Sequence, residues 1–417
     1  MNSSTKERVV VTGMGAFTPL GVNVSDLWQN MLINKSGIST VDLFDITGFR
    51  TTVGGLVDRS SLVESCKKSN VPRHDPSVQM AVLAADEAMT ESGLLVQCPP
   101  HTPLDISVIV GTGAGCNQSF FDGLTGFAAK KVRGLRPTTV PRCLINAAPA
   151  LISMQFKLTG PNYSISSACA SATTAIGNGF RMIRDGYSSQ ALCCGTEMPF
   201  TPFAFGAWNN LRIMSKNQDP MAACRPFAAD RDGMVIGEGA GALLLESLSS
   251  AKERGASIRG EIIGFGLSSD ATHITVPSTD GQVKAMQNAI NSAGLTKNDI
   301  GFINAHGTAT RISDTTEAKS IRQLFGSNTD SIPAGSNKSF FGHLLGASGA
   351  VETIVTLLGL ENRQVPANMN LQNPDPECNI NLVGGSPMTI DSPIAMKNSF
   401  GFGGNNAVLI LKRWEQN

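Results

Sequence analysis

The sequence predicts a layered α/β protein made of two similar halves. Short β-rich runs alternate with helical patterns along the 417 residues, which is typical of helices packed on a sheet. Two pairs of segments also resemble each other across the chain, and this indicates an internal duplication. No low-complexity linker separates the two parts. We therefore expect one compact body with halves at residues 1–255 and 256–417.

The expected elements follow in chain order. Strand-like apolar runs lie at 8–12, 106–111 and 190–195, one helical pattern covers about 76–92, and another helix opens after Cys169. The later half repeats the same rhythm.

The internal similarity involves four segments. EAMTESGL at 87–94 resembles NAINSAGL at 288–295, and each precedes a buried-looking strand. SSACASATTAIG at 166–177 resembles FFGHLLGASGAVE at 340–352, and both are small-residue turns that open into helices. Two α/β halves placed face to face would bring these turns to one central site.

Composition excludes several classes of function. Lys plus Arg and Asp plus Glu both number 33, so no overall field attracts nucleic acid or an anionic membrane. The nine cysteines are odd in number and form no CxxC pair, which favours a reducing cytoplasm. No apolar run approaches the ~20 residues that cross a bilayer. We expect a cytoplasmic protein without membrane or nucleic-acid partners.

Cys169 is the candidate nucleophile. It lies in SISSACASATTAIGNGF, where small residues join a strand-like run to a helix. A helix N-terminus lowers the pKa of a thiol, and the small neighbours leave room for a thioester and for N–H donors to its oxyanion. A lone cysteine is more often a small buried apolar residue, so the assignment depends on its companions.

Two histidines in glycine-flanked turns accompany it. His306 ends an apolar strand in NAHGTAT, and His343 lies at the start of a helix, between Lys338 and Glu352. With five histidines in the chain, two such placements favour a function over satisfied core residues. Zinc bound by one Cys and two His is the rival interpretation, but no close-spaced ligand pair supports it, and we expect no metal.

A third motif is the glycine-rich turn NSFGFGGNN at 398–406, which includes Phe400 and Phe402. Such a turn exposes backbone N–H groups, as an oxyanion hole or a phosphate nest requires. Alone it is a weak signal, and in combination with the other motifs it becomes specific.

These motifs together resemble the β-ketoacyl-(acyl carrier protein) synthases, above all the type II enzymes and the ketosynthase subunits of type II polyketide systems. The ordered motifs are SACASA, RPFAADRDGMVIGEGAGALLLE, NAHGTAT, SNKSFFGHLLGASGAVE and GFGG, and the resemblance covers nearly the whole chain. It implies a thiolase fold with duplicated halves in five αβαβα layers. It also implies an acyltransferase that performs decarboxylative Claisen condensation, as a homodimer or as a heterodimer with a chain-length-factor-like subunit.

The resemblance also implies residue roles. Cys169 would carry the acyl chain, with its own N–H and that of Phe402 as the oxyanion hole. His306 and His343 would face the malonyl group, and imidazole N–H donors there would stabilise the enolate left by loss of CO₂. Lys338 and Glu352 would form an ion pair that holds His343 in position.

Substrate contacts follow from the same resemblance. Thr308 and Thr310 would hydrogen-bond the phosphopantetheine arm, and Phe400 would also contact substrate. The arm arrives on an acyl carrier protein, so the chain needs no cofactor of its own. Carrier proteins are acidic and would dock on basic residues around the tunnel mouth. The candidates, of which Arg212 aligns best, are Lys67, Lys68, Arg73, Lys130, Lys131, Arg133, Arg136 and Arg212.

Three positions depart from the usual fatty-acid enzyme. Ala114 stands where an isoleucine commonly gates the acyl pocket, Trp208 stands where phenylalanine is usual, and Asn405 replaces a Thr or His beside the oxyanion turn. The changes affect substrate fit rather than the nucleophile. The acyl chain and the pathway, fatty acid or polyketide and polyene, therefore stay open.

Three alternatives share the fold. A non-catalytic chain-length subunit would lack the cysteine. A CoA-dependent thiolase would carry a second cysteine in its C-terminal loop, whereas Cys378 lies outside GFGGNN. A ketosynthase that starts chains from acyl-CoA would show Cys, His and Asn rather than Cys and two His.

Overall fold

The computed structural model describes residues 6–97 and 102–415, and Cys98 lies outside the described residues. The strands of its main sheet are β1 (Val9–Phe17), β4 (Ser107–Gly111), β5 (Asn162–Ile165), β6 (Gln190–Glu197), β7 (Gly239–Ser247), β8 (Gly260–Ser269), β9 (Phe302–Asn304), β10 (Ala334–Gly335), β13 (Ile394–Gly401) and β14 (Asn405–Lys412). Two small hairpin-like sheets are β2 (Ile38–Thr40) with β3 (Val53–Gly55), and β11 (Gln364–Val365) with β12 (Met388–Thr389).

The main sheet repeats one topology twice. Its order is β10-β9-β13-β14-β8-β1-β7-β6-β4-β5. In the first half β5, β4 and β6 are parallel and β7 and β1 follow antiparallel. In the second half β10, β9 and β13 are parallel and β14 and β8 follow antiparallel. The halves join where Val9–Val11 of β1 pairs antiparallel with Gly260–Ile262 of β8.

Helices cover both faces of these sheets. The helices are α1 (Val24–Leu32), α2 (Arg59–Lys68), α3 (Pro76–Glu91), α4 (Leu94–Gln97), α5 (Asn117–Lys130), α6 (Thr139–Cys143), α7 (Ala147–Phe156), α8 (Ser171–Arg184), α9 (Pro202–Asn210), α10 (Leu248–Glu253), α11 (Thr279–Ala293), α12 (Arg311–Phe325), α13 (Lys338–Phe341) and α14 (Ser348–Asn362). Short 3₁₀ turns are η1 (Lys131–Gly134), η2 (Lys297–Asp299), η3 (Gly326–Asp330), η4 (Leu345–Ala347) and η5 (Phe402–Gly404).

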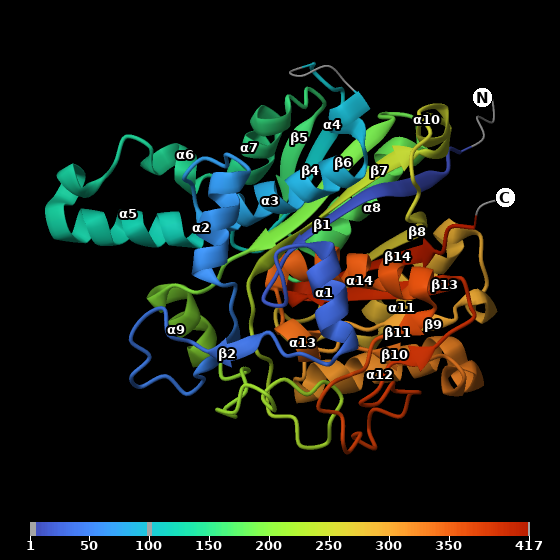
Figure 1. Ribbon diagram of the computed structural model, residues 1–417. Coiled ribbons are helices and arrows are strands. Elements are labelled where there is room, and N and C mark those ends of the chain that lie inside the picture. The colour runs from blue at the N-terminus through green and yellow to red at the C-terminus, as the bar shows by residue number, and fades with distance from the viewer. Residues whose placement is uncertain (1–5, 98–101, 416–417) are drawn as a thin grey trace.

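The core is arranged in five layers (Figure 1). Helices α8 and α14 pack together between the two halves of the sheet, in one apolar cluster with β1, β7 and β14. A second cluster joins α3 and α7 to the outer face of the first half, and a third joins α11 and α12 to the outer face of the second half. In the described part of the chain, no helix has the length and hydropathy that a membrane span requires.

The duplication expected from the sequence is present in the fold. The similar segments at 87–94 and 288–295 end the corresponding helices α3 and α11, and those at 166–177 and 340–352 lead into α8 and α14. The expected elements at 8–12, 76–92, 106–111 and 190–195 match β1, α3, β4 and β6, with β1 extending to Phe17. The proposed boundary after residue 255 falls between α10 and β8.

One arm leaves this body. The segment from α5 to α6 extends away from the layers (Figure 1). It exposes large apolar side chains, among them Phe120, Leu124, Phe127, Val132 and Val140. A monomeric surface rarely gathers so many apolar side chains on one segment, so the arm is a candidate interface.

The first turns of α8 and α14 touch each other, and Gly349 permits the contact. A Cβ at Gly349 would overlap the backbone nitrogen and the hydroxyl of Thr173. Thr173 and Gly349 are both buried and lie in the first turns of their helices. The close approach brings the turn before α8 against the turn before α14.

We expect Gly349→Ala to destabilise the fold. Alanine favours helix by ~1 kcal/mol over glycine, but overpacking against a rigid backbone costs typically 1–3 kcal/mol, occasionally more. The free energy of unfolding, measured by urea denaturation, should therefore fall. Gly384→Ala is the control because a Cβ there meets no atom within 4 Å. Equal stability of the two variants would contradict the close packing.

Candidate active site

A cavity of about 360 Å³ opens between the two halves. Cys169, His306 and His343 line it and are themselves buried, whereas Arg212 and Arg311 line it and are exposed. The cavity therefore leads from the protein surface to the thiol and the two imidazoles.

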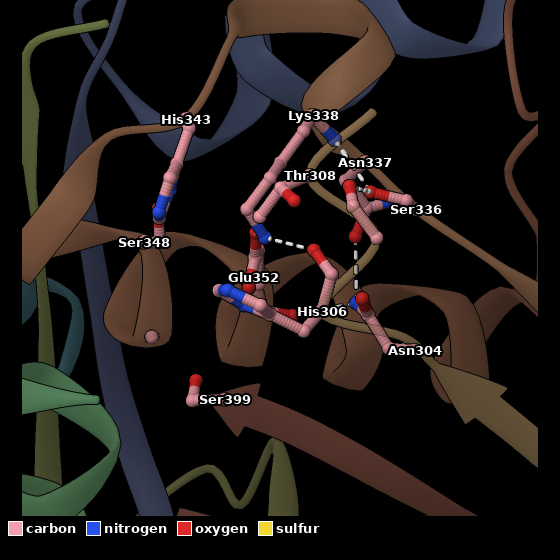
Figure 2. Close-up of polar contacts among 12 residues, drawn as sticks. Asn304, His306, Thr308, Ser336, Asn337, Lys338, His343, Ser348, Glu352 and Ser399 are labelled. Carbon is pink, nitrogen blue, oxygen red and sulfur yellow. Dashed lines mark hydrogen bonds and ion pairs between the residues drawn. The ribbon is translucent and has the colours of Figure 1, made fainter. Parts of the chain in front are cut away.

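The two halves contribute different reactive groups. Cys169 lies between β5 and α8, His306 lies two residues after β9, and His343 lies between α13 and α14. The sulfur and one ring nitrogen of each histidine lie within 4.8 Å of one another. The ring centroids of His306 and His343 are 5.2 Å apart with planes at 83°, and Figure 2 shows the ring of His343 directed toward Ser348.

A tight turn presents Cys169 to the cavity. Ala168 has φ +51°, in the left-handed region, and Ser171 accepts a hydrogen bond from the Ser167 N–H and donates one to the Ala168 carbonyl. The backbone N–H of Phe402 points at the sulfur from the glycine-rich turn. The predicted oxyanion partner thus lies beside the predicted nucleophile.

The pKa of Cys169 corrects one expectation. Burial raises the pKa of this thiol from 9.0 to about 12, against the opposing charge of Lys338. Three pKa units correspond to ~4 kcal/mol, whereas a helix N-terminus supplies ~0.3–2 kcal/mol. Desolvation outweighs the helix dipole, so the thiol is neutral at neutral pH in the substrate-free site.

Both histidines are neutral as well. Burial first, and then the charge of Lys338, lower the pKa of His306 and His343 well below 6.5. The His343 Nδ1 lies 2.9 Å from the Ser348 hydroxyl. A neutral imidazole has one N–H donor and one acceptor nitrogen, so each ring is able to accept a proton and to donate a hydrogen bond.

Lys338 and Glu352 form a fully buried ion pair. The Lys338 Nζ lies 2.5 Å from Glu352 Oε1. It also donates to the His306 carbonyl oxygen at 2.5 Å, as the dashed line in Figure 2 marks. The pair therefore contacts His306, and the expectation that it holds His343 is wrong: Ser348 is the hydrogen-bond partner of that ring.

Lys397 is a second buried lysine that sequence reasoning missed. It lies on β13, and its Nζ is 2.9 Å from Glu352 Oε2. The available signal was a lysine inside the strand-like run IAMKNSF, a segment that is buried on both faces.

Glu197 was also missed. Its carboxylate accepts from the backbone N–H groups of Gly113 at 2.6 Å, Gly346 at 3.0 Å and Ala114 at 3.1 Å. Burial raises its pKa to about 7. It joins the loop after β4 to the turn that follows His343. A carboxylate at the end of the apolar run QALCCGTE was the local signal.

Most of the residues predicted to contact substrate lie on the cavity wall. Thr308, Thr310, Trp208, Phe400 and Phe402 line the cavity. The threonine hydroxyls are 3.0 Å apart, and the rings of Trp208 and Phe402 stack at 6.0 Å.

Two of the three positions at which the sequence differs from the usual fatty-acid enzyme, Ala114 and Asn405, do not line the cavity. Ala114 is exposed on the loop after β4 and does not line the cavity of this chain. Asn405 donates to the Phe402 carbonyl at 3.0 Å and so stabilises the glycine-rich turn.

The candidate docking residues are all exposed, but they are dispersed. Arg212 alone among them lines the cavity, together with Arg311, which the sequence did not single out. Lys67 and Lys68 end α2, Arg73 follows that helix, and Lys130, Lys131, Arg133 and Arg136 lie on or next to the arm.

Known proteins match this chain over its length. Residues 6–251 match the N-terminal domain of the β-ketoacyl synthase family model, and residues 259–372 match the C-terminal domain. The chain belongs to the β-ketoacyl synthase family. It is therefore a condensing acyltransferase.

Two relatives are full-length matches named 3-oxoacyl-(acyl carrier protein) synthase 2. The Synechocystis sp. protein is 37% identical, with 100% of both chains covered, and the Staphylococcus aureus protein is 37% identical over 99% of this chain and 100% of the relative.

Solved structures of ketosynthases have the same fold as this chain. The ishigamide ketosynthase/chain length factor has a TM-score of 0.90 at 30% identity, and a β-ketoacyl synthase from Burkholderia phymatum has 0.88 at 30%. A type II polyketide ketosynthase in complex with its acyl carrier protein, bound to the hexaketide, has 0.89 at 27%. Each alignment covers 98% of this chain and 100% of the other. The thiolase-fold expectation is confirmed.

The neutral thiol predicts how this synthase reacts with alkylating agents. Alkylation of Cys169 by iodoacetamide should accelerate about tenfold per pH unit across neutral pH, because the thiolate fraction rises with pH far below a pKa of about 12. Intact-mass analysis gives the rate, and Cys169→Ser identifies the site. A rate independent of pH between about 6 and 8 would instead indicate a preformed thiolate.

Proposed function

We propose that this chain is an elongating 3-oxoacyl-(acyl carrier protein) synthase in which Cys169 carries the acyl chain and His306 and His343 serve the malonyl half-reaction. The observation that carries the proposal is the convergence of the thiol and both imidazoles within 4.8 Å at the inner end of one cavity. The full-length relatives of the same name support the substrate class.

The first half-reaction is acyl transfer. The Cys169 sulfur attacks the thioester carbonyl of an acyl carrier protein while a neutral imidazole accepts the thiol proton. The N–H groups of Cys169 and Phe402 stabilise the oxyanion. The carrier thiol then leaves with the proton, and the acyl chain remains on the sulfur.

The second half-reaction is decarboxylative condensation. Malonyl-carrier protein loses CO₂, and the electrons of the broken C–C bond form an enolate that imidazole N–H donors stabilise. The enolate carbon attacks the Cys169 thioester, the C–S bond breaks, and the sulfur regains a proton. The product is a β-ketoacyl chain on the carrier protein.

The cavity wall fits a pantetheine arm. Thr308 and Thr310 present hydroxyls, and the rings of Trp208 and Phe402 offer an apolar face. The arm arrives on the carrier protein, so the synthase needs no cofactor of its own. Arg212 and Arg311 at the mouth are the docking residues we favour, because they line the cavity and are positively charged.

A zinc site is the second function that the geometry raises, since one sulfur and two ring nitrogens converge. The ammonium charge of Lys338 that helps lower the pKa of both histidines also opposes a divalent cation. We therefore infer a metal-free site.

The synthase has a surface suited to a second subunit. β5 is an edge strand of the sheet, and the arm exposes Phe120 and Val132. Unpaired edges and apolar patches are the features that association covers. We infer a dimer through this face, either with a second copy or with a chain-length-factor-like subunit.

The chain serves fatty-acid or polyketide elongation. We infer from the family resemblance that the small side chain of Ala114 leaves room for the acyl chain at the loop after β4, outside the cavity that this chain lines. The eight cysteines that the structure describes are all free thiols, which supports a cytoplasmic location.

Cys169→Ala should abolish acyl loading and condensation yet retain decarboxylation of malonyl-carrier protein, because the imidazoles remain. Intact-mass analysis reports loading, and CO₂ release reports decarboxylation. Cys66→Ala, at another buried thiol, should leave both intact. Full condensation by the Cys169 variant would refute the nucleophile.

Ala114 does not line the cavity of this chain, and we infer from the family resemblance that the acyl chain extends past that cavity to the loop after β4. Ala114→Ile should then shorten the longest acyl chain accepted, because a larger side chain on that loop would obstruct it. Mass spectrometry of products from a series of acyl-carrier proteins measures the limit. Ser257→Ile, at an exposed residue outside the cavity, is the control. An unchanged product distribution would remove the role given to Ala114.

A further inference from the structure

Lys397 is a buried charge that the proposed half-reactions do not use. Its side chain is 0% exposed. Besides Glu352, its Nζ contacts the hydroxyl of Ser399 on the same strand and lies 3.3 Å from the hydroxyl of Thr173 on α8. A buried ammonium is costly unless it is paired, so this position requires an electrostatic reason.

Glu352 joins two lysines through its two oxygens. Oε1 lies 2.5 Å from the Lys338 Nζ and Oε2 lies 2.9 Å from the Lys397 Nζ, with all three side chains fully buried. The lysines come from α13 and β13 and the carboxylate comes from α14. Lys397 thus occupies the side of the carboxylate that Lys338 leaves free.

One further carboxylate faces the same group. Glu317 on α12 accepts from the backbone N–H groups of His306 and Gly307, each at 2.8 Å, and from Asn398 at 3.1 Å. Burial raises the pKa of Glu317, and the hydrogen bonds of these three donors oppose that shift. Three donors and no acceptor favour the ionised carboxylate. With Lys397 the two lysines balance the two carboxylates, and without it the cluster would carry one net negative charge beside the imidazoles.

We propose that Lys397 is a positioning residue that fixes Glu352 opposite Lys338 and supplies the second positive charge that keeps His306 and His343 neutral for acyl transfer to Cys169. The proposal rests on the proposed function. The charge of Lys397 acts on both rings. It lowers the pKa of His343 after burial and Lys338, and that of His306 after burial, Lys338 and His343. Neutral rings are needed because an imidazolium could not accept the thiol proton.

The test measures the rate at which an acyl-carrier protein loads Cys169, by intact-mass analysis from about pH 5 to about pH 9. Removing a positive charge raises the pKa of the imidazoles. The acid limb of the pH–rate profile of Lys397→Met should therefore move to higher pH by roughly one unit. At a given pH on that limb the rate should fall about tenfold. Lys397→Gln also removes the charge but keeps a polar N–H donor on a side chain one bond shorter, and we expect the same shift.

Two control variants retain the charge cluster. Ser399→Ala removes a hydrogen bond of Lys397 without changing charge, and Lys284→Met removes an exposed lysine on α11. Neither should move the acid limb.

The outcomes separate the two proposals. An unmoved limb in either folded Lys397 variant, or a shift with Met and none with Gln, would overturn the electrostatic role of Lys397. Absence of acyl loading on Cys169 in the parent protein would instead count against the proposed function.

Discussion

The charge of Glu352 is the constraint on which the site depends. An isolated carboxylate in the interior would cost several kcal/mol of desolvation, and this one is stabilised by an ammonium on each oxygen. Lys338 in turn contacts the carbonyl of His306. The ion cluster therefore fixes the backbone of one histidine, and its lysines lower the pKa of both rings, so the geometry and the electrostatics of the site have the same origin.

The duplicated fold provides the other half of this arrangement. Two α/β halves with the same strand topology place the N-terminal turns of α8 and α14 against each other. The thiol comes from the first half and the imidazoles come from the second. Neither half alone contains the groups for acyl transfer and condensation, so the packing of small residues at this contact is part of the chemistry.

Local motifs carried most of what could be predicted from the sequence. The His306 turn follows an apolar strand and the Cys169 turn follows a strand-like run, and such boundaries are visible in a few neighbouring residues. The duplication was visible because two segment pairs kept similar letters. These features place the nucleophile and the histidines without knowledge of tertiary contacts.

Tertiary properties were missed or predicted wrongly. Lys397 and Thr173 are separated by 224 positions, and no local pattern joins them. The direction of the Cys169 pKa was wrong because burial depends on both halves, whereas the helix N-terminus is a local feature. The prediction that the ion pair of Lys338 and Glu352 contacts His343 was wrong for the same reason. Spacing along the chain did not distinguish His306, which Lys338 contacts, from His343.

The most direct measurement is NMR of the full-length protein with ¹⁵N-labelled histidine. The chain has five histidines, and single His306→Ala and His343→Ala variants would assign the two that matter. The ring nitrogen shifts of both should be those of neutral imidazole from about pH 6 to about pH 8. Protonation of either ring at neutral pH would contradict the account, because it would mean a resting thiolate and imidazolium in place of a neutral site.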